Sequence, residues 1–513
     1  MAATRFARLM HRLHRALGSV LSLLIVLWFV SGAVMTFAGY PYLSEAERLM
    51  QAPSLPAELQ VEFPPELMRF FAEGALARGG EVRLSLLEAV PTWLYSDRAT
   101  PVAFRTAAPF AVAPLDDLRV RAEAARRFGL PIDSTELLTE FDQWTVAFAR
   151  KSVLPLYRVR FADAARTEVY LSAATGETLQ VTTRGERALA WVGAIPHWIY
   201  PTVLRRERAL WRSTVLVLAS LGLLLTLSGT AAGLHVSRTL KKRGVTPRDP
   251  YLRWHQTLGL WFGLFASSWL FSGAMSLSPF HWTGERGETA LEQDALYGAG
   301  AGLSPSAALV SVALHSCQRE LSVRELALRA LGGRVYAVCM ESATNTRLVD
   351  LADASLSVST TVALPELESV AARLAGPSRT PTLTVLHAYD AYHYPTHTSP
   401  EAALPFVTIA LQDEDESTYY LDPARALPLR RHTARTRLER WLYQGLHCFD
   451  LPGLYQQRAL WRTLMIAAMV VGATLSGLGL AMVVRRWRRG AAQRRRKEVA
   501  TGQDVSAEMV FRE

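Results

Sequence analysis

The sequence predicts an integral membrane α-helical protein with four transmembrane helices, arranged as two tandem parallel repeats. Three observations lead to this fold class. Four segments of about 20 residues are apolar and nearly free of charge, which is enough helix to cross about 30 Å of hydrocarbon. Lys and Arg residues gather on one side of each segment. Two groups of motifs recur at nearly constant offsets along the 513 residues.

The apolar runs place the spans in chain order. The first run, from Ala16 to Ala38, contains no charged residue. A secretory signal peptide would also follow basic residues, but its apolar core is shorter, and no cleavage site is evident here. The predicted segments are a cytoplasmic stretch 1–15, spans 16–39, 210–234, 256–278 and 460–484, a cytoplasmic loop 235–255, long loops 40–209 and 279–459, and a tail 485–513.

The basic residues predict the orientation. They cluster before the first span, in the short loop between the second and third spans, and in the tail. Because Lys and Arg are enriched on the cytoplasmic side, we expect both termini inside and the long loops in the periplasm of a bacterial inner membrane. These flanks account for the formal net charge of +10, so no nucleic-acid partner is expected. Cys317 and Cys339 in the second long loop either form a disulfide in this oxidising compartment or remain buried thiols.

The repeat is visible in two groups of motifs. At an offset of 241 residues, His14–Gly18 and Ser31–Ala33 match His255–Gly259 and Ser272–Ala274. At an offset of 250 residues, Trp191, His197 and Arg208–Arg212 match Trp441, His447 and Arg458–Arg462. Both halves have the same predicted orientation, so a pseudo-two-fold axis along the membrane normal should relate them.

The long loops contain patterns of helix and paired strands. In the first loop, Asp116–Arg127 predicts a helix, and Leu156–Phe161 and Thr167–Leu171 alternate like two strands of a hairpin. Phe406–Leu411 and Thr418–Leu421 repeat this plan in the second loop. We therefore expect a small α+β module in each loop.

Histidines at matching places in the two halves are candidate ligands. A haem iron takes two imidazoles, so one histidine from each half could hold a haem between helices. The candidate inner pair, at the cytoplasmic ends of the first and third spans, is His14 and His255, and the candidate outer pair is His197 and His447. His11 and His235 are alternates for the inner pair. Alternatively, these histidines only extend the basic flanks or pack at the interface.

A second group of histidines lies in the second loop. His387, His393 and His397 occur among tyrosines and Asp390. Such a set could hold a metal ion or a metal chelate, although ordinary aromatic packing also explains it.

The motifs together resemble the PepSY-associated transmembrane family over about residues 8–488. The resemblance rests on His14–Gly18, the Ser-Gly-Ala spans, Tyr170–Glu177 and Trp441–His447. It implies two periplasmic α+β PepSY-like domains and two b-type haems, with His14, His197, His255 and His447 as ligands. It also implies a ferric-siderophore reductase of the inner membrane. The second loop departs from the family pattern, because Asp422–Ala426 lacks the Gly-Glu turn of the first loop.

We therefore expect a haem-containing oxidoreductase that passes electrons to a periplasmic ferric siderophore or another metal chelate. The sequence has no dinucleotide-binding glycine motif, P-loop or Cys-x-x-Cys, and its cytoplasmic segments are short, so a quinol or a cytoplasmic flavoprotein should supply the electrons. The alternative is a non-redox membrane protein whose loops bind or regulate a peptidase or transporter. This alternative predicts no cofactor.

Overall fold

The computed structural model describes residues 2–96, 102–148, 153–284, 288–298, 303–395 and 402–510. The chain divides into two compact units. The first contains Met1–Gly39, Leu189–Phe280 and Trp441–Glu513, and the second contains Tyr40–Ala188 and His281–Arg440. The first unit therefore contains all four predicted spans, and the second contains most of both long loops.

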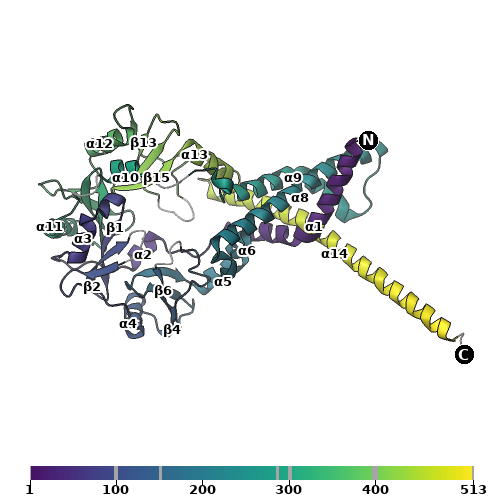
Figure 1. Ribbon diagram of the computed structural model, residues 1–513, viewed down its shortest axis with the longest axis horizontal. Helices are drawn as coiled ribbons and strands as arrows, with labels where there is room; N and C mark the ends of the chain where they lie inside the picture. Colours follow the sequence, from purple (N-terminus) through teal and green to yellow (C-terminus); the bar gives the residue numbers. More distant parts are fainter. Residues whose placement is uncertain are drawn as a thin grey trace. The chain divides into compact units, whose positions relative to one another are not determined.

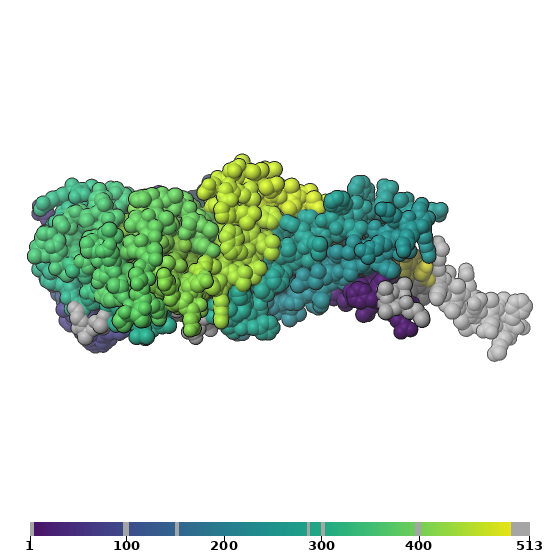
Figure 2. Space-filling model, turned by 90° about the horizontal axis from the view of Figure 1, so that it is seen from above, coloured from purple at the N-terminus to yellow at the C-terminus, as the bar shows by residue number. Residues whose placement is uncertain are grey.

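Four long helices build the first unit (Figure 1). They are α1 (Ala2–Met35), α8 (Arg208–Arg243), α9 (Pro250–Met275) and α14 (Arg458–Val510). The segments Arg5–Met35, Arg208–Arg243, Pro250–Met275 and Arg458–Gln493 are long and apolar enough to cross a membrane. Helix α1 packs against α8 and α14, and α9 packs against the same two helices. Figure 2 shows α8 and α9 at the surface of this unit, where Trp261 is 86% exposed, as expected for a side chain that faces lipid.

The helices extend beyond the predicted spans on the basic side. Helix α8 continues to Arg243 and ends at Gly244, whose φ of 63° permits the left-handed conformation of a helix C-terminus. Helix α9 begins at Pro250, and the Asp249 side chain caps it by accepting a hydrogen bond from the Tyr251 amide. Much of the predicted loop 235–255 is therefore helical.

Shorter elements connect the long helices. They are α5 (Arg184–Val192), α6 (Ala194–Trp198) and α7 (Thr202–Arg205) before α8, and α13 (Ala434–Arg440) and the π-helical turn η5 (Trp441–Gly445) before α14. Helix α6 packs on α1, and η5 packs on α9. Each connection therefore contacts the first long helix of its own half, α1 in the first half and α9 in the second.

In the second unit, the two loops share one seven-stranded sheet of order β11-β10-β9-β8-β1-β2-β3. Its strands are β1 (Glu81–Leu87), β2 (Val90–Ser96), β3 (Val102–Arg105), β8 (Glu325–Leu331), β9 (Arg334–Met340), β10 (Thr346–Asp350) and β11 (Val358–Ser359). The antiparallel pairing of β1 with β8 joins the loops. The pattern of each loop predicts a module of its own, whereas the structure joins the two loops in one sheet. Patterns within one loop carry no information about a partner strand some 240 residues away.

The remaining strands form two four-stranded antiparallel sheets, one in each loop. They are β4 (Ile132–Leu138), β5 (Leu156–Phe161), β6 (Glu168–Ser172) and β7 (Thr178–Thr182), and β12 (Thr382–Leu386), β13 (Phe406–Ala410), β14 (Thr418–Asp422) and β15 (Leu427–His432). The two predicted hairpins are confirmed as β5–β6 and β13–β14. The other helices are α2 (Glu45–Gln51), α3 (Pro65–Ala72), α4 (Asp117–Phe128), α10 (Ala290–Tyr297), α11 (Ala307–Gln318) and α12 (Leu364–Ala375).

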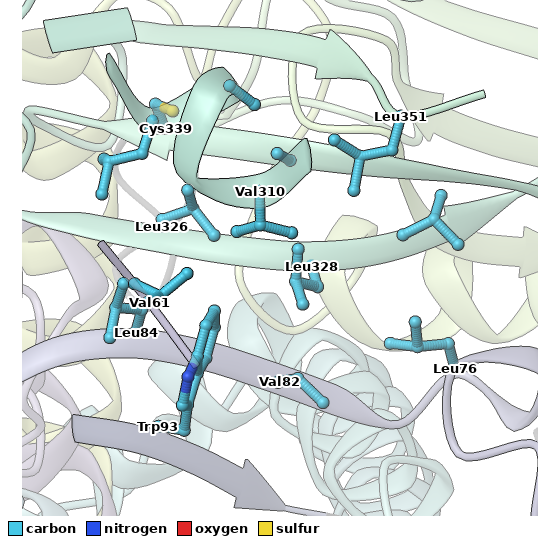
Figure 3. Packing of buried hydrophobic residues seen from close by; sticks show 14 of the residues in the cluster. Val61, Leu76, Val82, Leu84, Trp93, Val310, Leu326, Leu328, Cys339 and Leu351 are labelled. Carbon is cyan, nitrogen blue, oxygen red and sulfur yellow. The ribbon is translucent and has the colours of Figure 1, made fainter. Parts of the chain in front are cut away.

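The seam between the loops is an apolar core. Figure 3 shows Val82 and Leu84 of β1 beside Leu326 and Leu328 of β8, and all four side chains are fully buried. Cys339 belongs to the same core and forms a disulfide with Cys317, with Cα atoms 6.4 Å apart. Of the two alternatives that the sequence left open, the structure therefore has the disulfide.

One buried carboxylate lies at this seam between two guanidinium groups. Glu325, which is inaccessible to solvent, accepts hydrogen bonds from Arg83 Nη1 (3.2 Å) and Arg48 Nη2 (2.9 Å). Burial alone would raise the pKa of Glu325, but the charges of Arg83 and Arg48 overcome this effect and lower the pKa to about 2. The ion pairs therefore stabilise the folded protein above the ordinary pKa of 4.5, and this stabilisation is lost as the pH falls towards 2.

We expect Glu325→Gln to lower the free energy of unfolding by about 3–5 kcal/mol at pH 7, because the buried Arg83 and the half-buried Arg48 lose the anion that they share. Glu320→Gln is the matched control, since the exposed Glu320–Arg347 pair should contribute less than about 1 kcal/mol. Thermal unfolding of the full chain in detergent, followed by circular dichroism between pH 2 and pH 7, measures both. Equal losses for the two variants would contradict a special role of the buried pair.

Candidate functional site

The inner histidine pair is held by all four long helices. His14 of α1 and His255 of α9 have ring centroids 6.0 Å apart. His14 Nδ1 lies 2.9 Å from the Leu225 carbonyl oxygen on α8, and His255 Nδ1 lies 3.0 Å from that of Leu475 on α14. Because a carbonyl oxygen only accepts, Nδ1 carries the proton in both rings. Each Nε2 therefore keeps its lone pair, as a metal-binding imidazole requires.

The outer pair has the same construction. His197, in α6, and His447, just after η5, have ring centroids 6.1 Å apart. His197 Nδ1 donates to the Trp28 carbonyl oxygen at 3.2 Å, and His447 Nδ1 donates to that of Trp269 at 3.1 Å. Burial lowers the pKa of both imidazoles to about 4, so both are neutral at pH 7.

A glycine follows each accepting carbonyl by four residues. The carbonyl and glycine pairs are Leu225 and Gly229, Leu475 and Gly479, Trp28 and Gly32, and Trp269 and Gly273. A Cβ atom on Gly229 would lie 2.5 Å from His14 Cε1, and at the other three glycines it would lie 3.2–3.3 Å from the corresponding imidazole carbon. Glycine thus lets each ring approach the helix backbone. Gly229 recurs as Gly479 at the offset of 250, and this recurrence is the signal in the sequence that marks the two positions.

A repeated tryptophan positions the outer histidines. Trp211 Nε1 donates to the Trp198 carbonyl oxygen at 3.0 Å, and Trp461 Nε1 donates to that of Cys448 at 2.8 Å. These carbonyls belong to the residues directly after the outer histidines. The repeated Arg-Ala-Leu-Trp-Arg motif therefore fastens each outer histidine segment to α8 or α14, a role that was not evident from the sequence.

The alternate inner ligands do not form such a pair. His11 is exposed on α1, one turn before His14, and His235 is on α8. Within the described ranges, no other histidine ring lies against either of them. The inner geometry therefore centres on His14 and His255.

The histidines of the second loop are not gathered around a common centre. His387 is exposed, whereas His393 is 5% exposed and packs on Phe406 with ring centroids 4.4 Å apart. The Nε2 atom of His393 donates to the Ala403 carbonyl oxygen at 2.9 Å. His397 lies outside the described residues. Among the described residues, no three His, Cys, Asp or Glu side chains are arranged to hold a metal ion.

The ring spacing within each histidine pair fits two imidazoles that would hold one metal ion between them. Imidazoles on opposite sides of one metal ion, with metal–nitrogen bonds of about 2 Å, have ring centres about 6 Å apart. Both pairs match this spacing. Next to the outer pair, the buried indole Nε1 atoms of Trp28 and Trp269 lack a hydrogen-bond partner in the described part of the chain. A bound group with acceptor atoms would satisfy these two donors.

Four long apolar helices joined to a β-sheet unit define a multi-pass membrane protein. The family described as the PepSY-associated TM region matches residues 11–358, more than half of the chain, and the chain belongs to this family. The resemblance seen in the sequence is therefore confirmed. The matched range contains His14, His197 and His255 and ends before His447. No curated protein matches the chain.

Proposed function

We propose that this protein is a haem-containing electron-transfer protein of the bacterial inner membrane, which passes electrons to a periplasmic ferric siderophore or another metal chelate. The observation that carries the proposal is the presence of two histidine pairs with Nδ1 engaged and Nε2 available. His14 and His255 would hold one b-type haem, and His197 and His447 would hold the other.

The two sites occupy different depths along α1. The inner site includes His14, and the outer site contacts the backbone from Trp28 to Gly32. At 1.5 Å per helical residue, these levels are about 20–27 Å apart. Two haems at these depths would divide a crossing of about 30 Å into shorter electron-transfer distances.

Backbone carbonyl oxygens and apolar side chains of this chain set the state of the four candidate histidines. Haem, when bound, supplies reversible one-electron Fe(III)/Fe(II) chemistry. The carbonyl oxygens of Leu225, Leu475, Trp28 and Trp269 fix the tautomer and the orientation of the four rings. Apolar side chains of the four helices exclude water around them.

The same proposal includes the topology. Both termini and the basic end of α8 (Lys241–Arg243) would be cytoplasmic, and the two long loops would be periplasmic. The Cys317–Cys339 disulfide supports an oxidising compartment for the second loop. Contacts that recur at offsets of 241 and 250 residues support two parallel repeats about a pseudo-two-fold axis. A quinol or a cytoplasmic flavoprotein would supply electrons from the inner side.

Purified protein in right-side-out vesicles loaded with dithionite tests this function. We expect added ferric siderophore to reoxidise the protein, and a membrane-impermeant ferrous chelator outside to trap Fe(II). One electron converts Fe(III) into Fe(II), which hard oxygen ligands hold far more weakly. Vesicles of opposite orientation, with dithionite again inside, should trap little Fe(II).

Two results would count against the proposal in different ways. If ferric siderophore reoxidises the protein no faster than buffer, while copper or a quinone does so rapidly, the ferric assignment is wrong and transmembrane electron transfer remains. A colourless protein from haem-replete cells would instead favour the non-redox alternative, in which the loops bind a periplasmic peptidase or transporter.

A further inference from the structure

The two halves of the chain differ in charge where their second long helices begin. The first half carries three arginines at the start of α8, namely Arg205, Arg206 and Arg208. At the offset of 250 residues, the second half carries Tyr455, Gln456 and Arg458 at the start of α14. In the proposed topology this is the outer end of α8, where Lys and Arg are usually depleted. Neither the repeat nor the orientation therefore accounts for the two additional cations.

The single arginine of the second half is already engaged. Arg458 Nη2 donates to the Tyr455 hydroxyl at 2.6 Å, and the guanidinium carbon of Arg458 lies 4.2 Å from the centre of the Tyr455 ring. In the first half, Arg205 stands at the position of this tyrosine, so Arg208 has no such acceptor. Neither Arg205 nor Arg208 forms an ion pair with a carboxylate of the described residues. The second half is therefore an internal reference in which the matching cation has a partner.

Two aromatic rings hold the Arg205 side chain in place. The guanidinium carbon of Arg205 lies 5.1 Å from the centre of the Tyr200 ring and 4.9 Å from that of the Trp211 ring. These two rings pack edge to face, with centroids 5.6 Å apart. Within the part of the chain that the structure describes, Arg205 Nε has no hydrogen-bond partner. Cation–π contacts orient a guanidinium group without neutralising it, so Arg205 is a positioned cation that lacks an anion.

Exposed apolar side chains lie beside these cations. Val203 of α7 is 82% exposed, and Leu210 in the first turn of α8 is 57% exposed. Helix α7 packs against α8, and the segment Arg208–Arg243 is one of those long and apolar enough to cross a membrane. The positive charge therefore lies where an apolar helix surface begins. A ligand bound here would meet cations and apolar surface together.

The other charged side chains of this segment leave the positive charge in place. Residues 205–208 comprise three arginines and Glu207, which gives a formal charge of +2. Glu207 is exposed, and adjacent residues do not face each other on a helix. Arg212 Nε donates to the Leu277 carbonyl oxygen at 3.0 Å, so this arginine joins α8 to the end of α9. Arg205 and Arg208 remain as the cations that an anion could bind.

We propose that Arg205 and Arg208 bind the phosphate of an anionic phospholipid, such as phosphatidylglycerol, whose acyl chains lie along Val203 and Leu210. Guanidinium groups bind phosphate oxygens through charge-assisted hydrogen bonds. A phospholipid at the end of a membrane-crossing helix uses both the charge and the apolar surface, whereas a free phosphate ion uses only the charge. The proposal goes beyond electron transfer and does not depend on haem. It also holds for either orientation of the chain, because both leaflets present headgroups.

Titration of the full-length protein in detergent with short-chain phosphatidylglycerol, followed by native mass spectrometry, tests the proposal. The spectra count the lipids bound to each chain. The basic residues at the other end of the helices also attract anionic lipids, so the measured quantity is the difference between a variant and the unmodified protein. We expect Arg205→Gln combined with Arg208→Gln to remove one bound lipid. Each single substitution should weaken the binding of that lipid about fivefold, the contribution of one basic side chain at an anionic lipid surface.

Arg458→Gln is the matched control from the second half. It should keep every lipid, because Arg458 already donates to the Tyr455 hydroxyl. Short-chain phosphatidylcholine and inorganic phosphate, added at the same concentrations, should not occupy the site. Circular dichroism checks that each variant folds. If Arg205→Gln does not fold, Arg208→Gln alone decides the matter, since Arg208 is exposed.

Equal lipid binding by the unmodified protein and the folded arginine variants would overturn the proposal. An equal loss in Arg458→Gln would overturn the assignment to the first half. Competition by inorganic phosphate at the concentrations at which phosphatidylglycerol binds would show an anion site that does not select a lipid, and equally tight phosphatidylcholine binding would show that charge is not recognised. Either result contradicts the proposal. None of these results depends on the haem content, so they leave the proposed electron transfer unaffected.

Discussion

Replacing His14 or His255 by Ala is expected to remove about half of the bound haem, and replacing His197 or His447 is expected to remove the other half. Each pair loses one of its two candidate donors, so the iron would be held by one imidazole instead of two, and we expect that haem to be lost during purification. Haem per chain, measured as the pyridine haemochrome, gives the stoichiometry. Reduced-minus-oxidised spectra then show which of the two components is missing.

One control variant and two contrary results test this assignment of the histidines. His11→Ala should keep both haems, because His11 is exposed on α1 and is not a member of either histidine pair. Equal loss from all four variants would indicate one shared site or general misfolding. Full retention in His14→Ala would assign the inner ligand to His11 or His235.

Gly229→Ala is expected to remove the inner haem while the outer haem remains. The added methyl would lie 2.5 Å from His14 Cε1, closer than side-chain atoms approach, so the ring must leave the Leu225 carbonyl. The same substitution favours the helix itself by about 1 kcal/mol, because Ala has a higher helix propensity than Gly. A loss of haem therefore cannot be attributed to a weaker α8.

The matched control is Gly477→Ala in α14, where a Cβ atom would have nothing within 4 Å. Gly479→Ala should have a smaller effect than Gly229→Ala, since its Cβ would lie 3.2 Å from His255 Cε1. Haem stoichiometry and low-temperature difference spectra distinguish the two sites. If Gly229→Ala and Gly477→Ala retain equal amounts of inner haem, the glycine does not control the approach of the ring.

The two small sheets share a tyrosine position but differ in the residue opposite it. The sequence places Tyr420 at the position of Tyr170, and their common role in holding an aspartate follows from the shared strand register. The change from Arg158 to Thr408 is visible in the sequence as well. The structural effect of this change becomes visible only when the strands are paired, because the Arg158 guanidinium forms an ion pair with Asp142, which lies in another segment of the chain.

Hydropathy, alternation and motif offsets can be read from the sequence alone, and they predicted the four apolar helices, the hairpins of the two small sheets and the candidate histidines. The tertiary structure decided which nitrogen of each histidine is free, which glycines admit the rings, and that β1 and β8 join the loops in one sheet. It also showed that His393 is engaged with a backbone carbonyl. These features depend on contacts between residues far apart in the chain, and such contacts are determined by packing and hydrogen bonding in three dimensions.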